Sequence, residues 1–206
     1  MRIYYDTEFH EDGQRIELLS IGMVRQDGQR LYRVISDHGA ISRAVNHDWL
    51  RENVVRHLPV TIRDRGPEVF GYRWSWAWDY EHSDYEFVYS RAEVADHVRD
   101  FVLGSADPEL WAWYGAYDHV AICQLFGRMI DLPDGFPMFT CDIRQEAART
   151  CCDLRQEDGP VKPEGVAHNA LHDAIWDLHA HEWLIHREHA HLDSSAVVIP
   201  FIWPLR

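Results

Sequence analysis

The chain has 206 residues, 46% of them hydrophobic, which is typical of a globular protein with a substantial core and excludes a disordered chain. Its net charge is −14 and Lys162 is the only lysine, so a protein that coats nucleic acid through a broadly basic surface is also excluded. A nucleic-acid function would require acids gathered in a metal site, or arginines clustered locally.

No stretch approaches the roughly 20 apolar residues of a membrane helix, and the N-terminus lacks the basic and apolar pattern of a secretory signal. The four cysteines show no CxxC spacing, so we expect reduced thiols and a cytoplasmic location. We expect a single domain over residues 1–206, with an aromatic-rich insertion near 65–90 and an apolar tail at 193–206.

Three strands are predicted at the start of the chain, over residues 2–7, 14–25 and 29–35. The last two are joined by Asp27-Gly28, a strong hairpin signal between alternating apolar runs, so the three should form an antiparallel meander. Residues 41–58 then show helical spacing of Trp49, Val54 and Leu58 and end before Pro59.

Residues 66–90 are rich in aromatic side chains, which permits two interpretations. They could be stacking platforms for nucleic-acid bases, or an alternating hairpin or packed loop that buries its rings. The second is favoured, because stacking surfaces usually carry interleaved arginines and only Arg73 is present.

The rest of the chain alternates helix and strand. Ser90 and Glu93 form a capping box for a helix that ends at Gly104, and a short strand at 109–114 precedes a helix that Gly127 closes. A helix capped by Thr140 should cover 140–149. A long final helix from about residue 168 should place one apolar face inward: Leu171, Ala174, Ile175, Leu178 and Ile185. This order predicts an α/β fold with a mixed sheet flanked by helices.

Asp6 and Glu8 follow directly on the first strand. In a strand they point to the same face, which places two like charges within about 7 Å of each other. Two explanations are open at this point: solvent at a strand end tolerates the repulsion, or a divalent cation lies between the carboxylates.

Three further residues could join these acids. Asp118 begins a helix after a strand, although it could merely cap that helix. Asp173 lies in the first turn of the final helix, and His168, if it lies in the loop just before that helix, can fold over the same opening. Taken alone, each has a simpler interpretation that is favoured: Asp173 as an acid that suits a helix N-terminus, and His168 as an ordinary loop histidine. Oxygen ligands without cysteine favour Mg²⁺ or Mn²⁺, and such carboxylates around two ions, with a histidine base, are the template for phosphodiester hydrolysis.

Three segments in order, "YDTEF", "WYGAYDHVAIC" and "HNALHDA", resemble the exonuclease motifs of the DEDDh group of 3′-to-5′ exonucleases. Their flanks, including "PMFTCDIRQ", resemble RNase-T-like exoribonucleases of the type described as polyadenylate-specific. The resemblance covers about two thirds of the chain and omits residues 65–90 and the C-terminal tail. Because the unmatched aromatic segment could alter which 3′ ends enter, the polyadenylate preference is not carried over.

The resemblance implies a ribonuclease-H-like fold with a central five-stranded mixed sheet, and release of nucleoside 5′-monophosphates from RNA 3′ ends, including those of duplexes with a 3′ overhang. It implies two divalent cations, Mg²⁺ with Mn²⁺ as a substitute, on Asp6, Glu8, Asp118 and Asp173, with His168 as general base. It also implies a homodimer. A DNA exonuclease would use the same five residues, and a catalytically silent binding module is the remaining alternative.

Two further residues are candidates for substrate contacts. Phe9 could wedge against the terminal base or pack in the core, and Arg144 could bind a phosphate or form a surface ion pair. The "HEWLIH" segment is not a zinc-protease motif, because His181 and His186 are five residues apart rather than four.

Overall fold

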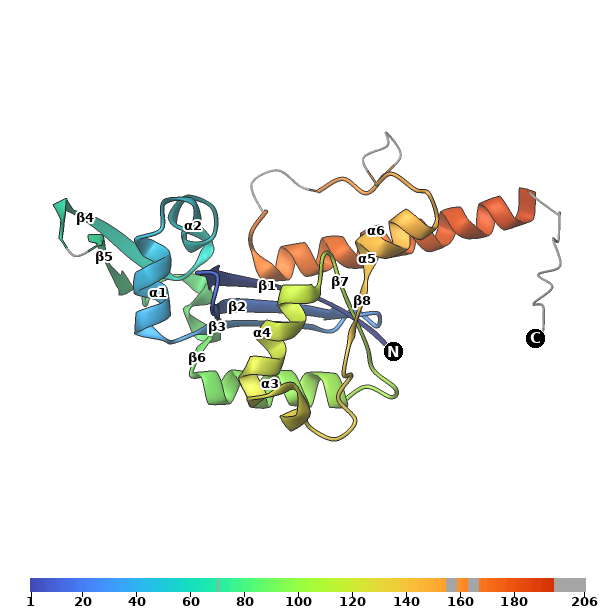
Figure 1. Ribbon diagram of the computed structural model, residues 1–206, viewed down its shortest axis with the longest axis horizontal. Coiled ribbons are helices and arrows are strands. Elements are labelled where there is room, and N and C mark those ends of the chain that lie inside the picture. Colours follow the sequence, from blue (N-terminus) through green and yellow to red (C-terminus); the bar gives the residue numbers. More distant parts are fainter. Residues whose placement is uncertain (70, 155–158, 163–166, 195–206) are drawn as a thin grey trace.

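The computed structural model of the chain describes residues 1–69, 71–154, 159–162 and 167–194, and the expected apolar tail at 193–206 lies almost wholly outside these residues. Six strands form a mixed sheet in the order β6-β3-β2-β1-β7-β8 (Figure 1). The bounds of these strands are Arg2–Glu11 (β1), Ile16–Arg25 (β2), Arg30–Ile35 (β3), Val88–Tyr89 (β6), Glu109–Ala112 (β7) and Thr140–Asp142 (β8).

The predicted antiparallel meander of β1, β2 and β3 is confirmed, and β7 and β8 extend the sheet in parallel. The expectation of five strands is wrong by one. The additional strand, β6, pairs only two residues with the end of β3, and so short a segment shows no alternation that a sequence pattern can reveal.

Helices cover both faces of the sheet (Figure 1). α3 (Arg91–Leu103) and α4 (Ala116–Phe126) bury their apolar residues against one face, together with Ile3 and Tyr5 of β1. The opposite face is covered by α1 (His38–Val45), α2 (Asp48–Asn53), α5 (Ile143–Arg149) and α6 (Ala170–Ser194), where Tyr4 is buried. The period-2 alternation of β1 thus separates two cores.

The aromatic segment forms a separate two-stranded hairpin, β4 (Val60–Val69) and β5 (Tyr72–Trp78), which confirms the hairpin interpretation. Trp74, Trp76 and Trp78 alternate along β5 and pack, partly buried, against the core of α1 and α2. The Trp76 indole donates a hydrogen bond to the Ser42 hydroxyl at 2.9 Å. A short 3₁₀ helix, η2 (Ser83–Phe87), then leads back to the sheet.

Two helix predictions need correction. The helix expected over 41–58 is broken into α1, α2 and a 3₁₀ turn, η1 (Val55–His57), because the His47 side chain accepts from the Leu50 backbone N–H and so starts a new helix. The helix expected from Thr140 begins at Ile143 instead, since Asp142 is its N-cap and Thr140 belongs to β8. A further 3₁₀ turn, η3 (Met129–Asp131), follows α4.

The buried face of α6 is more polar than predicted. Ala174 is buried as expected, but Leu171, Ile175, Leu178 and Ile185 are only half-buried. The polar side chains buried on this helix are Asp173, Asp177 and His181. Among the helices that the structure describes, none is both long enough and apolar enough to cross a membrane.

Candidate active site

The strand β1 presents its polar residues to two different sides of the sheet. Asp6 and Glu8 alternate with Thr7, which lies on the α4 side. The Thr7 backbone N–H and hydroxyl both donate to Asp118 Oδ1, at 2.9 and 2.6 Å. These two hydrogen bonds fix the first turn of α4 against β1 and hold the Asp118 carboxylate beside the strand that carries the other acids.

The start of α6 lies unusually close to the sheet, at Gly22 of β2. Gly22 pairs with Asp6 in the strand register, and a Cβ atom at this position would lie 2.2 Å from the Leu171 backbone N. Only glycine permits this approach of helix to strand. The helix therefore brings Asp173 over the face on which Asp6 and Glu8 lie.

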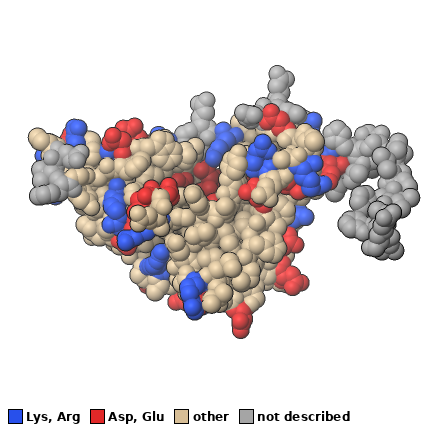
Figure 2. Space-filling model, in the orientation of Figure 1, with Lys and Arg blue, Asp and Glu red and all other residues tan. Residues whose placement is uncertain are grey.

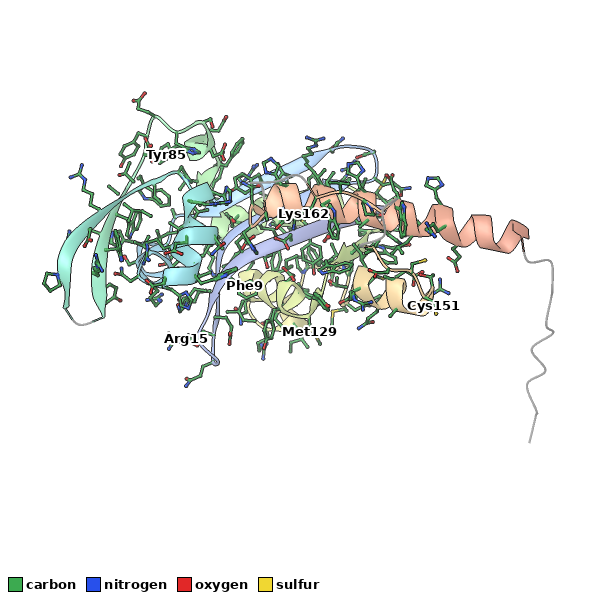
Figure 3. The ribbon with its side chains drawn as sticks, turned by 90° about the horizontal axis from the view of Figure 1, so that it is seen from above. Phe9, Arg15, Tyr85, Met129, Cys151 and Lys162 are labelled. Atoms are coloured by element: carbon green, nitrogen blue, oxygen red, sulfur yellow. The ribbon has the colours of Figure 1, made fainter. Side chains whose placement is uncertain are left out.

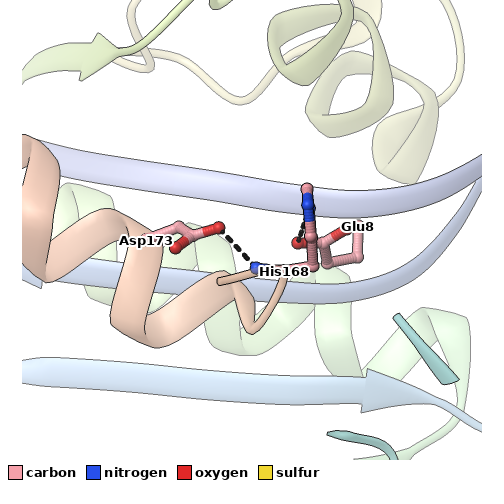
Figure 4. A group of neighbouring side chains, drawn as sticks. All are labelled: Glu8, His168 and Asp173. Carbon is pink, nitrogen blue, oxygen red and sulfur yellow. Dashed lines mark hydrogen bonds and ion pairs between the residues drawn. The ribbon is translucent and has the colours of Figure 1, made fainter. Parts of the chain in front are cut away.

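His168 precedes α6, as expected for a histidine that folds over the acids (Figure 4). Its backbone is in the left-handed region, with φ of +66°, and its N–H donates to Asp173 Oδ2 at 2.9 Å. Its ring Nδ1 lies 4.0 Å from Glu8 Oε1, and the edge-on ring of Trp49 lies 4.9 Å away between centroids. A strained backbone held by a carboxylate fixes the direction of this imidazole.

All five predicted motif residues line one cavity of about 390 Å³: Asp6, Glu8, Asp118, His168 and Asp173. In the space-filling view, acidic atoms lie in a hollow near the middle of the upper edge, and basic atoms lie beside it over the α5 and α6 side (Figure 2). This local arrangement places positive charge next to the acids, although the chain as a whole carries a net charge of −14.

The electrostatics of the cavity match the expectation that the acids repel. Burial raises the pKa of Glu8 to about 8, with further contributions from Asp173 and Asp118. Burial followed by repulsion from Glu8 raises the pKa of Asp6 well above its ordinary value, and burial raises that of Asp118 to about 6. Placing several carboxylates in one buried site is unfavourable unless a cation compensates them.

The donor set fits a divalent cation. Ligand atoms of Glu8, His168 and Asp173 lie within 4.8 Å of one another, and no other group of this kind occurs in the described part of the chain. Asp173 Oδ1 is buried without a hydrogen-bond partner, although the Lys162 ammonium lies 2.7 Å away. The carboxylate oxygens of Glu8 and Asp173 are donors that suit Mg²⁺ or Mn²⁺, whereas the third member of the triplet is an imidazole nitrogen. Asp6 and Asp118 line the same cavity but stand outside this close triplet.

Three further residues at or beside the cavity were not predicted from the sequence as parts of a site. Lys162 pairs with Asp173, and its position as the only lysine, six residues before His168, was a usable signal. Asp177 is buried one turn after Asp173 and accepts from the Trp113 backbone N–H at 3.0 Å, as an i, i+4 pair on one helix face allows. Trp49 was assigned to an apolar face but is half exposed and lines the cavity.

The remaining predicted contacts lie in different places. Phe9, in β1, lines the cavity and is labelled in the view from above (Figure 3). Its ring meets that of Tyr117 edge-on, with 6.1 Å between the ring centroids. Arg144 does not line this cavity but an adjoining one. His181 belongs to no metal cluster in the described residues; it is buried, and its Nδ1 lies 3.0 Å from the Tyr4 hydroxyl.

The chain is similar to two curated proteins from strains of Mycobacterium tuberculosis, 3′-5′ exoribonuclease Rv2179c and 3′-5′ exoribonuclease MT2234.1. Each is 38% identical over 176 residues, which is 84% of this chain and 87% of the relative. Residues 1–184 match the family described as the 3′-5′ exoribonuclease Rv2179c-like domain. The chain therefore belongs to this family of 3′-5′ exoribonuclease domains.

Proposed function

We propose that the chain is a DEDDh-type 3′-to-5′ exoribonuclease that removes nucleoside 5′-monophosphates from RNA 3′ ends. The observation that carries this proposal is that Asp6, Glu8, Asp118, His168 and Asp173 line one cavity. The strand order β3-β2-β1-β7-β8, with β2 antiparallel to β1, supports the ribonuclease-H-like assignment.

Asp6, Glu8, Asp118 and Asp173 would hold two divalent cations, Mg²⁺ or, as a substitute, Mn²⁺. The chemistry that such cations supply is a lowered pKa of the attacking water and stabilisation of the departing 3′ oxygen. The four carboxylates would bind the cations and fix their positions. Thr7 keeps the Asp118 carboxylate in place through its two hydrogen bonds. The raised pKa values of Asp6, Glu8 and Asp118 mean that cation binding should release protons.

His168 is the proposed general base. Burial lowers its pKa, so the imidazole is neutral near pH 7 and can accept a proton from the attacking water. Its side chain is 40% exposed at the mouth of the cavity, which gives the proton a path to solvent. Asp173, which holds the His168 backbone, and Trp49, which contacts its ring, are the residues that position it.

The aromatic side of the cavity suits the terminal base. Phe9, Trp49 and Tyr117 line it, and Trp49 and Tyr117 are about half exposed, so their rings are available for stacking. Phe9 would then act as the wedge. Selection of RNA over DNA depends on contacts to the 2′-hydroxyl.

The test uses a 5′-labelled RNA duplex with a 3′ overhang, incubated with Mg²⁺ or Mn²⁺ and with chelator, beside a DNA duplex of the same sequence. We expect a ladder that shortens from the RNA 3′ end, requires the divalent ion and is lost in Asp6→Ala. Faster loss of DNA would favour the DNA exonuclease. Intact RNA and DNA under every ion would favour a silent binding module.

We also propose a homodimer in the cytoplasm, with residues 1–206 as a single domain. Cys123, Cys141, Cys151 and Cys152 are all free, which fits a reducing compartment. Sedimentation equilibrium at several protein concentrations measures the oligomeric state, and a single monomeric mass throughout would contradict the dimer.

A further inference from the structure

A second cavity, of about 470 Å³, adjoins the candidate active site. The two cavities share Trp113 and Tyr114 as walls, and the remaining wall of the second comes from α5, the segment after it and Trp176 of α6. Whatever occupies the second cavity therefore lies next to whatever occupies the first.

The aromatic walls of this cavity are held in place. The rings of Trp113 and Trp176 meet edge-on at 5.4 Å, and the Trp176 indole donates to the Pro160 carbonyl at 3.2 Å. The Trp113 backbone N–H is fixed by Asp177, and Tyr114 is 64% exposed with φ of +57°. Pre-positioned aromatic faces on a hydrophilic surface are the kind of platform on which nucleic-acid bases stack.

Arg144 gives the cavity a cation with no partner among the described residues. Arg149, on the same helix, is paired with Glu146 and Glu188, whereas no hydrogen bond or ion pair engages the Arg144 guanidinium. A half-buried, unpaired guanidinium beside aromatic rings suits a phosphate group. Asp153 also lines the cavity.

We propose that this cavity is a second nucleotide subsite, which binds the RNA nucleotide next to the one at the cleavage cavity, with its base on the aromatic walls and its phosphate on Arg144. The inference rests on the proposed function. The shared Trp113–Tyr114 wall gives the continuity that one RNA strand needs. The four acids of the proposed metal site lie in the first cavity, and the Arg144 guanidinium lies in the second.

The test is a binding titration by fluorescence anisotropy, with 5′-fluorescein-labelled hexa-adenylate and Ca²⁺ in place of Mg²⁺ under conditions first shown to give no turnover. Unlabelled AMP serves as the one-nucleotide competitor. Arg144→Ala should weaken hexanucleotide binding about tenfold and make the slope of log affinity against log salt shallower by about 0.7. It should leave the AMP affinity within about twofold, since charge-assisted hydrogen bonds are local.

Two control variants sharpen the result. Arg128→Ala removes an exposed arginine that caps η3 and is paired with Asp131, and it should change neither affinity. Arg144→Lys keeps the charge and should restore part of the lost binding.

The outcomes separate this inference from the proposed function. If the wild type degrades RNA but Arg144→Ala binds the hexanucleotide normally, or loses AMP binding equally, the subsite is overturned and the function stands. If the wild type binds no RNA, both fall. If Arg144→Ala loses RNA binding only because a dimer dissociates on size-exclusion chromatography, the cavity is a protein interface and the subsite is again overturned.

Discussion

The helix α6 buries two polar clusters, one at the candidate active site and one around His181, and they are buried to a similar degree. Asp173 is 7% exposed and His181 is 2% exposed. The His181 cluster is complete, since its Nδ1 meets the Tyr4 hydroxyl at 3.0 Å and its ring stacks on Trp111 at 3.9 Å between centroids. The acid cluster is incomplete, because the Lys162 ammonium, 2.7 Å from Asp173 Oδ1, compensates one carboxylate, while Glu8 still faces Asp173 and Asp118.

This difference separates a structural cluster from a binding site. Buried polar groups that find neutral partners stabilise a fold, whereas buried charges of one sign are unfavourable until something compensates them. Burial lowers the pKa of His181 to about 4, so it stays neutral and needs no cation or anion. The acids of the active-site cluster, in contrast, need a cation to compensate their negative charge. The comparison predicts that changes in the first cluster act on stability, and changes in the second act on ligand binding.

The change that should disrupt both clusters together is Gly22→Ala. The new Cβ would lie 2.2 Å from the Leu171 backbone N, so the start of α6 must move outward. We expect a loss of about 3 kcal/mol in the free energy of unfolding and at least about a 100-fold loss of activity, since displacing catalytic groups by 1 Å has such an effect. Urea denaturation and RNA degradation measure the two.

The matched control for Gly22→Ala is Gly39→Ala. A Cβ at Gly39, in α1, would meet only side-chain atoms, at 3.2 Å or more, so this variant should be neutral or slightly stabilising. If Gly22→Ala behaved in the same way, the close approach of α6 to β2 would be unnecessary for the site.

His181→Ala should affect the stability of the protein but not its activity, and so distinguish the two clusters. It removes a buried ring and leaves the Tyr4 hydroxyl without its partner, so we expect a loss of about 2 kcal/mol in unfolding free energy. RNA degradation at 25 °C should stay within about twofold of wild type, because no proposed active-site residue contacts His181. His179→Ala, which changes an exposed histidine on the same helix, is the control. A large drop in activity with unchanged stability would reverse the assignment.

The clusters should also have opposite pH signatures in chelator. Between its ordinary pKa of 4.5 and about 8, Glu8 keeps a proton in the folded state that the unfolded chain has lost, so stability falls as pH rises through this window. Between 6.5 and about 4, the unfolded chain binds a proton that buried His181 does not, so stability falls as pH falls.

Melting temperatures measured from pH 4.5 to 9 test this expectation. The metal-free wild type should lose about 5 °C between pH 6 and 8.5. Glu8→Gln should reduce that alkaline loss and leave the acid side unchanged, while His181→Ala should do the reverse. Curves that keep the same shape in both variants would show that other groups set the pH dependence.

The five motif residues were predictable from three short segments that occur in the right order, because the pattern around each residue alone left a capping or surface role open; the structure brings all five to one cavity. The meander and the capping box of α3 follow from local signals in the sequence. No such signal marks β6 or the break between α1 and α2, where a two-residue pairing and one histidine cap decide the structure. The polar face of α6 was not predicted, because the apolar pattern alone was used to choose the inward side.

Substitution of Lys162 should have the smallest effect of these changes. It tests whether this lysine neutralises part of the negative charge of the acid cluster. Its ammonium lies 2.7 Å from Asp173 Oδ1 and above the Trp176 ring, so it supplies part of the positive charge that a divalent cation would supply. Lys162→Gln should therefore lower the melting temperature in chelator and tighten Mn²⁺ binding about threefold by calorimetry, a modest factor because the side chain is 36% exposed. Arg15→Gln, on an exposed turn, removes one positive charge elsewhere and should change neither quantity. Weaker Mn²⁺ binding in Lys162→Gln would mean that the lysine assists the cation instead of competing with it.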